Sequence, residues 1–334
     1  MTRLHLATAT LAALLAACGG TAASGEPSLR PSIAPTASVA PSAPFAPTAP
    51  DDVVRIPLSG AAPGALVLRG GRAWVLAGEG GSLMEVELAA RRELRAIEVG
   101  FGATHLAVLE DGVAAVGRFD DSANGSYLVL ADLQTEEIRG VPTGALGGLA
   151  LGEDGIVWAL EQADRLLKVD TGSAEIVAEL GVDIGENVHL EVQWGAGSAW
   201  VGSDGTPVVR VGGGNLAIEA TISVPSGLPF LFEDGQLWGA GPTALWAIDP
   251  AKNEVVRNVA LDDVIEILGV AVDGDEAWLA VRRPGYVGRV LRLALPAGDV
   301  VGEFDVGLPA AVKLGPDRAW VTSYLDNELV GFPR

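Results

Sequence analysis

The sequence Arg318-Ala319-Trp320-Val321, near the C-terminus, is one copy of a motif that recurs along most of the chain. In six of the seven copies an aliphatic residue precedes a tryptophan, and in most of these a second aliphatic residue follows it. The tryptophans are Trp74, Trp158, Trp200, Trp238, Trp278 and Trp320, and Ala115 holds the equivalent position in one copy. Successive copies lie 41, 43, 42, 38, 40 and 42 residues apart. A constant period of this length is typical of proteins built from repeated structural units.

Each repeat contains four short apolar or alternating runs, separated by turn residues. The third repeat has these runs at residues 148–151, 156–160, 165–169 and 175–180. The turns Glu153-Asp154-Gly155 and Asp170-Thr171-Gly172 separate them. Four strands in about 41 residues are the pattern of a β-propeller blade. Seven copies therefore predict an all-β, seven-bladed propeller over residues 51–334.

The two ends of the repeat region predict how the ring closes. The last repeat stops after three strands, whereas residues 53–58 match the fourth-strand pattern seen at residues 94–99. We expect the N-terminal strand to complete the last blade, which would pair two otherwise open edges. Two separate β domains are the alternative.

The first fifty residues differ in composition from the repeats. Residues 1–17 have the short basic start and apolar core of a secretion signal, and Leu15-Ala16-Ala17-Cys18 resembles the lipobox of bacterial lipoproteins. The resemblance implies that Cys18, the single cysteine, is lipidated; an ordinary signal peptide is the alternative. Residues 19–50 contain seven Pro, eight Ala and five Ser, so we expect residues 18–50 to form a lipidated, disordered tether. The expected location is extracytoplasmic, anchored to the outer membrane or cell surface.

The net charge of the chain limits the classes of partner that it is expected to bind. Lys plus Arg total 22 against 43 Asp plus Glu, a formal net charge of -21. Nucleic-acid binding needs clustered cations, so DNA and RNA are not expected partners. A single cysteine excludes an intrachain disulfide. We expect a monomer that contacts the membrane through its anchor and binds a protein, peptide or glycan.

Three segments resemble the YVTN-type repeat. They are Gly-Pro-Asp-Arg-Ala-Trp-Val-Thr-Ser at 315–323, Val-Gly-Leu-Pro at 306–309 and Ile-Asp-Pro at 248–250. The resemblance implies a seven-bladed propeller over residues 51–334. It is unspecific for function, because such propellers include binding proteins, surface proteins, streptogramin lyases and lactonases.

One end of the predicted ring is the expected ligand-binding face. It gathers the loops between blades together with the loops between the second and third strands of each blade. The candidates there are Phe101, His105, Phe119, Asp120, His189, Asp204, Arg282, Tyr286 and Tyr324. Ordinary solvated loop residues are the alternative. The six repeated tryptophans are interpreted as packing between blades, with ligand stacking as the alternative.

No catalytic motif stands out, so no catalytic residue is assigned. His105 and His189 lack the His, Glu and second His arrangement of streptogramin lyases. Asp120, Ser122 and Asn124, followed by Gly125, match only the first half of a calcium loop, because Ala131 stands where that loop has glutamate. We expect no cofactor, with Ca²⁺ or Mg²⁺ at this loop as the alternative. The leading hypothesis is a non-enzymatic binding module; the alternative is a metal-dependent propeller enzyme, a lyase or lactonase.

Overall fold

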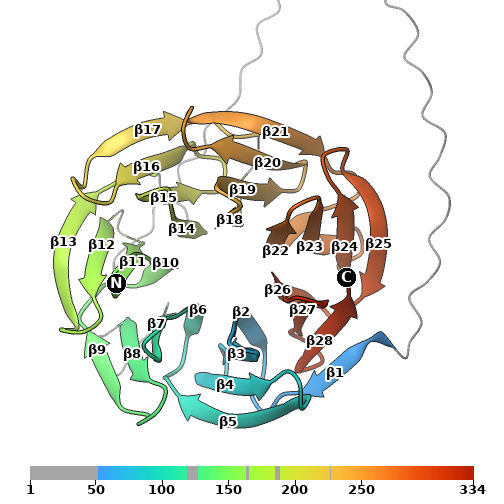
Figure 1. Cartoon of the computed structure of the whole chain (residues 1–334), viewed down its shortest axis with the longest axis horizontal. Coiled ribbons are helices and arrows are strands. Elements are labelled where there is room, and N and C mark those ends of the chain that lie inside the picture. The colour runs from blue at the N-terminus through green and yellow to red at the C-terminus, as the bar shows by residue number, and fades with distance from the viewer. Residues whose placement is uncertain (1–51, 119–126, 163–164, 185–188, 226) are drawn as a thin grey trace, which may run out of the picture. The chain divides into compact units, whose positions relative to one another are not determined.

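The computed structural model describes residues 52–118, 127–162, 165–184, 189–225 and 227–334. These residues form seven four-stranded antiparallel sheets arranged as blades around a central axis (Figure 1). The predicted all-β, seven-bladed propeller is confirmed. The signal peptide, Cys18 and the tether predicted before the ring lie outside the described residues, as do Phe119, Asp120, Ser122 and Asn124.

Each blade is a meander that runs from the centre of the ring to its rim. Blade 1 consists of β2 (Pro63–Arg69), β3 (Arg72–Ala77), β4 (Ser82–Glu87) and β5 (Arg92–Glu98). Blade 2 consists of β6 (Ala103–Val108), β7 (Val113–Arg118), β8 (Leu128–Asp132) and β9 (Ile138–Val141). Blade 3 consists of β10 (Leu146–Leu151), β11 (Ile156–Glu161), β12 (Arg165–Asp170) and β13 (Glu175–Gly181). Blade 4 consists of β14 (Leu190–Gly195), β15 (Ser198–Ser203), β16 (Val208–Gly212) and β17 (Ile218–Ile222).

The remaining blades follow the same scheme. Blade 5 consists of β18 (Phe230–Glu233), β19 (Gln236–Gly241), β20 (Ala244–Asp249) and β21 (Glu254–Ala260). Blade 6 consists of β22 (Glu266–Asp273), β23 (Glu276–Arg283), β24 (Val287–Ala294) and β25 (Asp299–Asp305). Blade 7 consists of β26 (Pro309–Leu314), β27 (Arg318–Ser323), β28 (Glu328–Pro333) and the N-terminal β1 (Val54–Pro57).

Burial within a blade explains its sequence pattern. The second strands are covered on both faces by neighbouring blades, so they read as continuous apolar runs, as in β11. The fourth strands have one face on the rim, so they alternate, as in β13. Five of these outer strands, β5, β13, β17, β21 and β25, shift register against the third strand. Such bulges make the exposed sheet edge a poor template for pairing with another chain.

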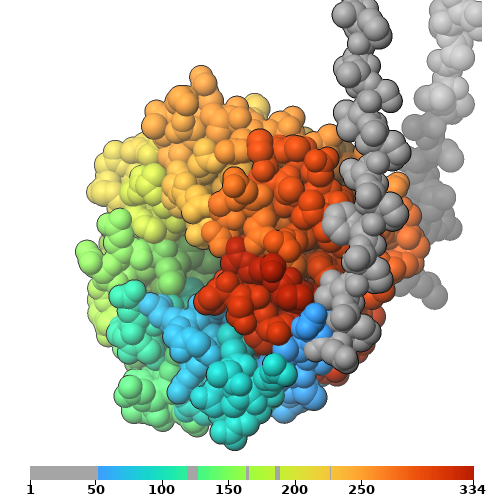
Figure 2. Space-filling model, turned by 45° about the vertical axis from the view of Figure 1, so that its right-hand side comes forward, coloured from blue at the N-terminus to red at the C-terminus, as the bar shows by residue number. Residues whose placement is uncertain are grey.

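The ring closes through its two ends, as the repeat count predicts. β1 pairs antiparallel with β28, and Val54, Arg55, Ile56 and Pro57 lie opposite residues 331 to 328. In Figure 2 the blue N-terminal strand and the red C-terminal residues adjoin on the surface. This closure excludes the alternative of two separate β domains.

The six repeated tryptophans are all buried. Most lie in apolar clusters that combine residues of two adjacent blades: Trp158 packs with blade 4, Trp238 with blade 6 and Trp278 with blade 7. A cation covers several of the rings, with Arg210 at 4.9 Å from the Trp200 centroid and Lys168 at 5.6 Å from that of Trp158. These environments match the interpretation of the tryptophans as packing between blades.

Candidate functional site

A large cavity opens at the end of the ring where the interblade connections meet. We call it the mouth cavity; it has a volume of about 1210 Å³, and side chains of blades 2 to 6 line it. Its lining includes five residues of the predicted face: His105, His189, Asp204, Arg282 and Tyr286. Far apart in sequence, these residues come together because every blade contributes its first strand and an adjoining loop to the same end of the axis. Their role in binding stays a prediction.

His189 forms a pair with Asp204 on the wall of this cavity. His189 precedes β14 and Asp204 follows β15, and these strand ends are paired. His189 Nδ1 lies 3.1 Å from Asp204 Oδ2. Both side chains are exposed. A carboxylate on Nδ1 fixes the orientation and tautomer of an imidazole, which leaves its other nitrogen for a ligand or a proton. The geometry is therefore compatible with recognition and with acid–base chemistry.

His105 has a different environment, deeper in the ring. Its Nδ1 lies 2.8 Å from the Thr104 hydroxyl. Burial lowers the pKa of His105 to about 4, against a smaller opposing effect of a hydrogen bond with the Gly147 backbone. His105 is consequently a neutral imidazole at physiological pH, able to donate one hydrogen bond and accept another.

Arg282 and Tyr286 lie side by side at the edge of the mouth cavity. The guanidinium of Arg282 pairs with Glu266 at 2.7 Å and lies 5.6 Å from the centroid of the Tyr286 ring. Tyr286 is 77% exposed, and its backbone has a φ of 59°. A bulky residue in the left-handed region is energetically unfavourable and is often found at sites of recognition. The neighbouring Arg283 instead pairs with Glu303.

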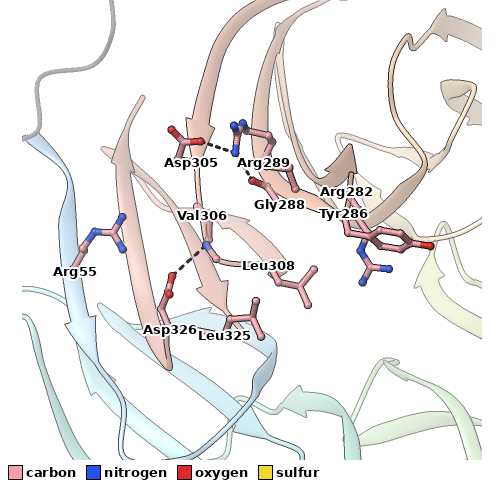
Figure 3. Close-up of a pocket in the computed structure, with 12 residues that line it drawn as sticks. Arg55, Arg282, Tyr286, Gly288, Arg289, Asp305, Val306, Leu308, Leu325 and Asp326 are labelled. Atoms are coloured by element: carbon pink, nitrogen blue, oxygen red, sulfur yellow. Dashed lines mark hydrogen bonds and ion pairs between the residues drawn. The ribbon is translucent and has the colours of Figure 1, made fainter. Parts of the chain in front are cut away.

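A second cavity of about 590 Å³ adjoins the mouth cavity between blades 6 and 7. Figure 3 shows the ion pair of Arg289 and Asp305 on one wall and Tyr286 beside Arg282 on another. Arg282 and Tyr286 line both cavities, so they form the ridge between them. The exposed Leu325 lines the second cavity.

Two predicted residues lie outside both cavities. Phe101 occupies the loop between β5 and β6 and is 65% exposed. Tyr324 donates a hydrogen bond of 3.0 Å from its hydroxyl to Glu79, which links blades 7 and 1, and this bond raises the pKa of Tyr324. Exposed large apolar side chains nevertheless gather at this end: Phe101, Ile265, Tyr286, Val287 and Leu325.

The channel beneath the mouth cavity is lined by two charged residues that the sequence analysis missed, and a third charged residue acts on one of them. Its volume is about 340 Å³, and Glu191 on β14 and Lys313 on β26 line it. Glu233, at the end of β18, acts electrostatically on Lys313. A charged residue between apolar ones in a first strand, as in Leu190-Glu191-Val192 and Val312-Lys313-Leu314, is the signal that would have indicated them.

Burial controls the ionisation of this channel. It raises the pKa of Glu191 to about 7, and it lowers the pKa of Lys313. The pKa of Glu233 is also raised, first by burial and then by the adjacent Asp234. Near neutral pH, Glu191 is therefore protonated in a substantial fraction of molecules, and a protonated carboxyl can donate a hydrogen bond.

Two kinds of feature are absent from the described ranges. No group of three or more His, Cys, Asp or Glu side chains there could hold a metal ion. No helix in those ranges has the length and hydropathy needed to cross a membrane. The predicted calcium ligands Asp120, Ser122 and Asn124 lie outside the described residues.

Comparison with known proteins supports the fold. No protein-family model matches the chain, and no curated protein sequence matches it. The structure is similar to that of the RRP9 WD40 repeats, with a TM-score of 0.70 and 12% identity over 87% of this chain and 99% of the other. It is similar to U3-55K, with a TM-score of 0.69 and 12% identity over 85% and 99%. The computationally designed Ika8 protein gives a TM-score of 0.60 and 13% identity over 84% and 99%. At these identities the likeness shows a shared propeller fold.

Proposed function

We propose that this protein is a lipid-anchored, extracytoplasmic binding module that holds a protein or peptide partner at the mouth cavity. The Arg282–Tyr286 ridge between two cavities is the observation that carries the proposal. Tyr and Arg are the side chains most often found at the energetic centre of protein interfaces. Around this ridge the other exposed apolar residues of the same end, among them Ile265 and Leu325, provide further contact area.

The lining of the mouth cavity favours a peptide over a glycan. Leu190, Leu228, Pro229, Ile267 and Leu268 provide apolar walls. A few polar groups converge between these walls, including His105, His189 and Glu191. Apolar walls with few convergent polar groups are typical of pockets that take up side chains, whereas sugars present hydroxyls that need many hydrogen bonds.

A peptide library displayed with free C-terminal ends tests this binding role. Peptides selected on the wild-type protein are measured against Tyr286→Ala and against the control Val177→Ala, which removes an exposed side chain from the outer strand β13. We expect Tyr286→Ala to weaken binding by at least tenfold, about 1.4 kcal/mol, and Val177→Ala to leave it unchanged. Equal binding to all three proteins, or binding of glycans alone on a glycan array, would contradict the proposal.

The membrane anchor is tested separately on the full chain. We expect radiolabelled palmitate to be incorporated into the wild-type protein and not into Cys18→Ser. We also expect the variant to leave the membrane fraction. Retention of label or of membrane association by Cys18→Ser would reject the lipoprotein assignment.

The pairing of His189 with Asp204 keeps an enzymatic role as a second candidate, of the lyase or lactonase class. Turnover of lactones or cyclic esters that needs a divalent metal and is lost in His189→Ala and His105→Ala would favour it. If no lactone or cyclic ester is turned over with or without Mg²⁺ or Ca²⁺, the enzymatic role is rejected and only the binding role remains.

A further inference from the structure

The mouth cavity and the channel below it are continuous. Thr104, His105, Glu191, Pro229 and Leu268 line both, so a chain end seated in the mouth can extend into the channel. The inference that follows rests on the proposed peptide-binding role and concerns which part of the peptide enters.

Lys313 differs from the other two lysines of the chain. Lys168 donates a hydrogen bond to the Gly213 carbonyl at 3.2 Å, and Lys252 pairs with Asp249 at 2.8 Å. Among the described residues, by contrast, no carboxylate lies within 4.0 Å of the Lys313 ammonium, and no hydrogen bond joins it to the protein. Glu191 and Glu233 attract it only from farther away. Lys313 is thus a cation without an adjacent anion, placed on the wall of a channel.

The other charges around the channel do not supply that anion. On the mouth side Glu266 is neutralised by Arg282, and at the other end of β22 the carboxylate of Asp273 is paired with Arg334. Asp204 is paired with His189. The other titratable and charged groups that line the two spaces or act on Glu191, Glu233 and Lys313 are His105, His189, Asp204, Asp234, Glu266, Asp273 and Arg282. Arg334 is linked to this set through its pair with Asp273.

We infer that the channel binds a carboxylate, the free C-terminus of the partner peptide, between Lys313 as the cation and Glu191 as a hydrogen-bond donor. Burial deprives the Lys313 ammonium of water. A carboxylate beside it would replace that lost solvation with an ion pair. Glu191 in its protonated form can donate to the second carboxylate oxygen, and Gln193, 3.0 Å from Glu191, offers a further amide. Leu106, Leu268 and Ala311 line the same channel, so an apolar terminal side chain fits beside the carboxylate.

The proposed binding of a carboxylate in the channel should depend on pH. A bound carboxylate favours the protonated form of both Glu191 and Lys313, so binding takes up protons. Affinity should rise as the pH falls through about 7, the pKa of Glu191, by up to about tenfold per pH unit for one linked proton. A ligand that entered with an ammonium group would show the opposite slope.

The carboxylate site is tested by NMR of the mature chain after reductive methylation of its lysines with ¹³C-formaldehyde. Lys313→Met identifies the Lys313 resonance, and Lys252→Met is the matched loss of one lysine on the surface. We expect N-acetyl-leucine, which has a carboxylate and no ammonium, to shift the Lys313 resonance and raise its pKa. Leucine amide, which has only the ammonium, should do neither. A response to leucine amide, or none to N-acetyl-leucine, would overturn the inference.

The peptides selected for the mouth cavity decide the source of the carboxylate. Each is synthesised with a free and with an amidated C-terminus. We expect amidation, like Lys313→Met, to weaken binding by more than tenfold, about 1.4 kcal/mol, with no change in Lys252→Met. Glu191→Gln should keep binding and flatten its pH dependence. If amidated peptides bind equally well and still need Tyr286, the peptide-binding role stands and the assignment of the channel to a peptide C-terminus fails. If the channel binds N-acetyl-leucine but no peptide, its ligand is a small carboxylic acid and the assignment to a peptide C-terminus also fails.

Discussion

The Arg55 guanidinium donates a hydrogen bond of 2.7 Å to Glu328, although 273 positions separate the two residues in the chain. This contact lies on the ladder between β1 and β28, where the first and last strands of the ring meet. This pairing closes the ring.

Removing the apolar part of this closure should destabilise the protein far more than removing its ion pair. Ile56 on β1 is completely buried, whereas the Arg55 side chain is 46% exposed. We expect Ile56→Ala to lower the free energy of unfolding by about 2–5 kcal/mol, and Arg55→Ala by about 0.2–1 kcal/mol. Urea unfolding followed by tryptophan fluorescence measures both. Similar losses in the two variants would show that burial does not dominate the closure.

The contact between blades 6 and 7 should depend on a stack of aromatic rings. Trp278 stacks on Phe304 with centroids 5.4 Å apart, and Phe304 in turn contacts Phe332 at 4.6 Å. We expect Trp278→Ala to cost about 3–5 kcal/mol. A double-mutant cycle with Phe304→Ala should give a coupling of about 0.5–1.5 kcal/mol. Additive losses would mean that the two rings contribute only their separate burial.

Glu191 should make the protein less stable as the pH rises. Its pKa is about 7 in the folded state against 4.5 for the unconstrained group, so the folded state binds the proton more tightly. The stabilisation is complete below pH 4.5 and is lost between pH 4.5 and about 7, by at most about 3 kcal/mol. Glu191→Gln cannot ionise and should therefore be more stable than the wild type at pH 8 and nearly equal to it at pH 4.5.

Thermal or urea unfolding of both proteins across this range gives the difference directly. His105, whose pKa is lowered to about 4, opposes this trend because its contribution is lost as the pH falls from 6.5 towards 4. Since both proteins contain His105, its effect cancels in the comparison. A constant difference between the two proteins at all pH values would contradict the raised pKa of Glu191.

Tyr286 should matter for binding and not for folding. Its side chain is 77% exposed, and its φ of 59° is unfavourable for any residue with a side chain other than Asn or Asp. We expect Tyr286→Ala to change the free energy of unfolding by less than about 0.5 kcal/mol. Tyr286→Gly should be as stable or slightly more stable, because glycine tolerates this φ. A large loss of stability in either variant would assign Tyr286 a structural role.

Part of the candidate site could be predicted from the sequence. The repeat period indicates which loops share one end of the ring, and His105, His189, Asp204, Arg282 and Tyr286 line one cavity there. A period contains neither the side-chain geometry within a blade nor the distances between blades, so the pairing of His189 with Asp204 and the contact of Tyr324 with Glu79 were not predicted.

The sequence by itself determined the number of blades, the strand order within each and the closure of blade 7 by a strand within residues 53–58. Those properties follow from local patterns: a period near 41 residues, turn residues between strands, and alternation on the rim. Only the tertiary structure decided that Glu191 and Glu233, from blades 4 and 5, both act electrostatically on Lys313 of blade 7. Their interaction depends on the closed ring, because closure faces first strands of distant blades across the axis and removes their charged groups from bulk water.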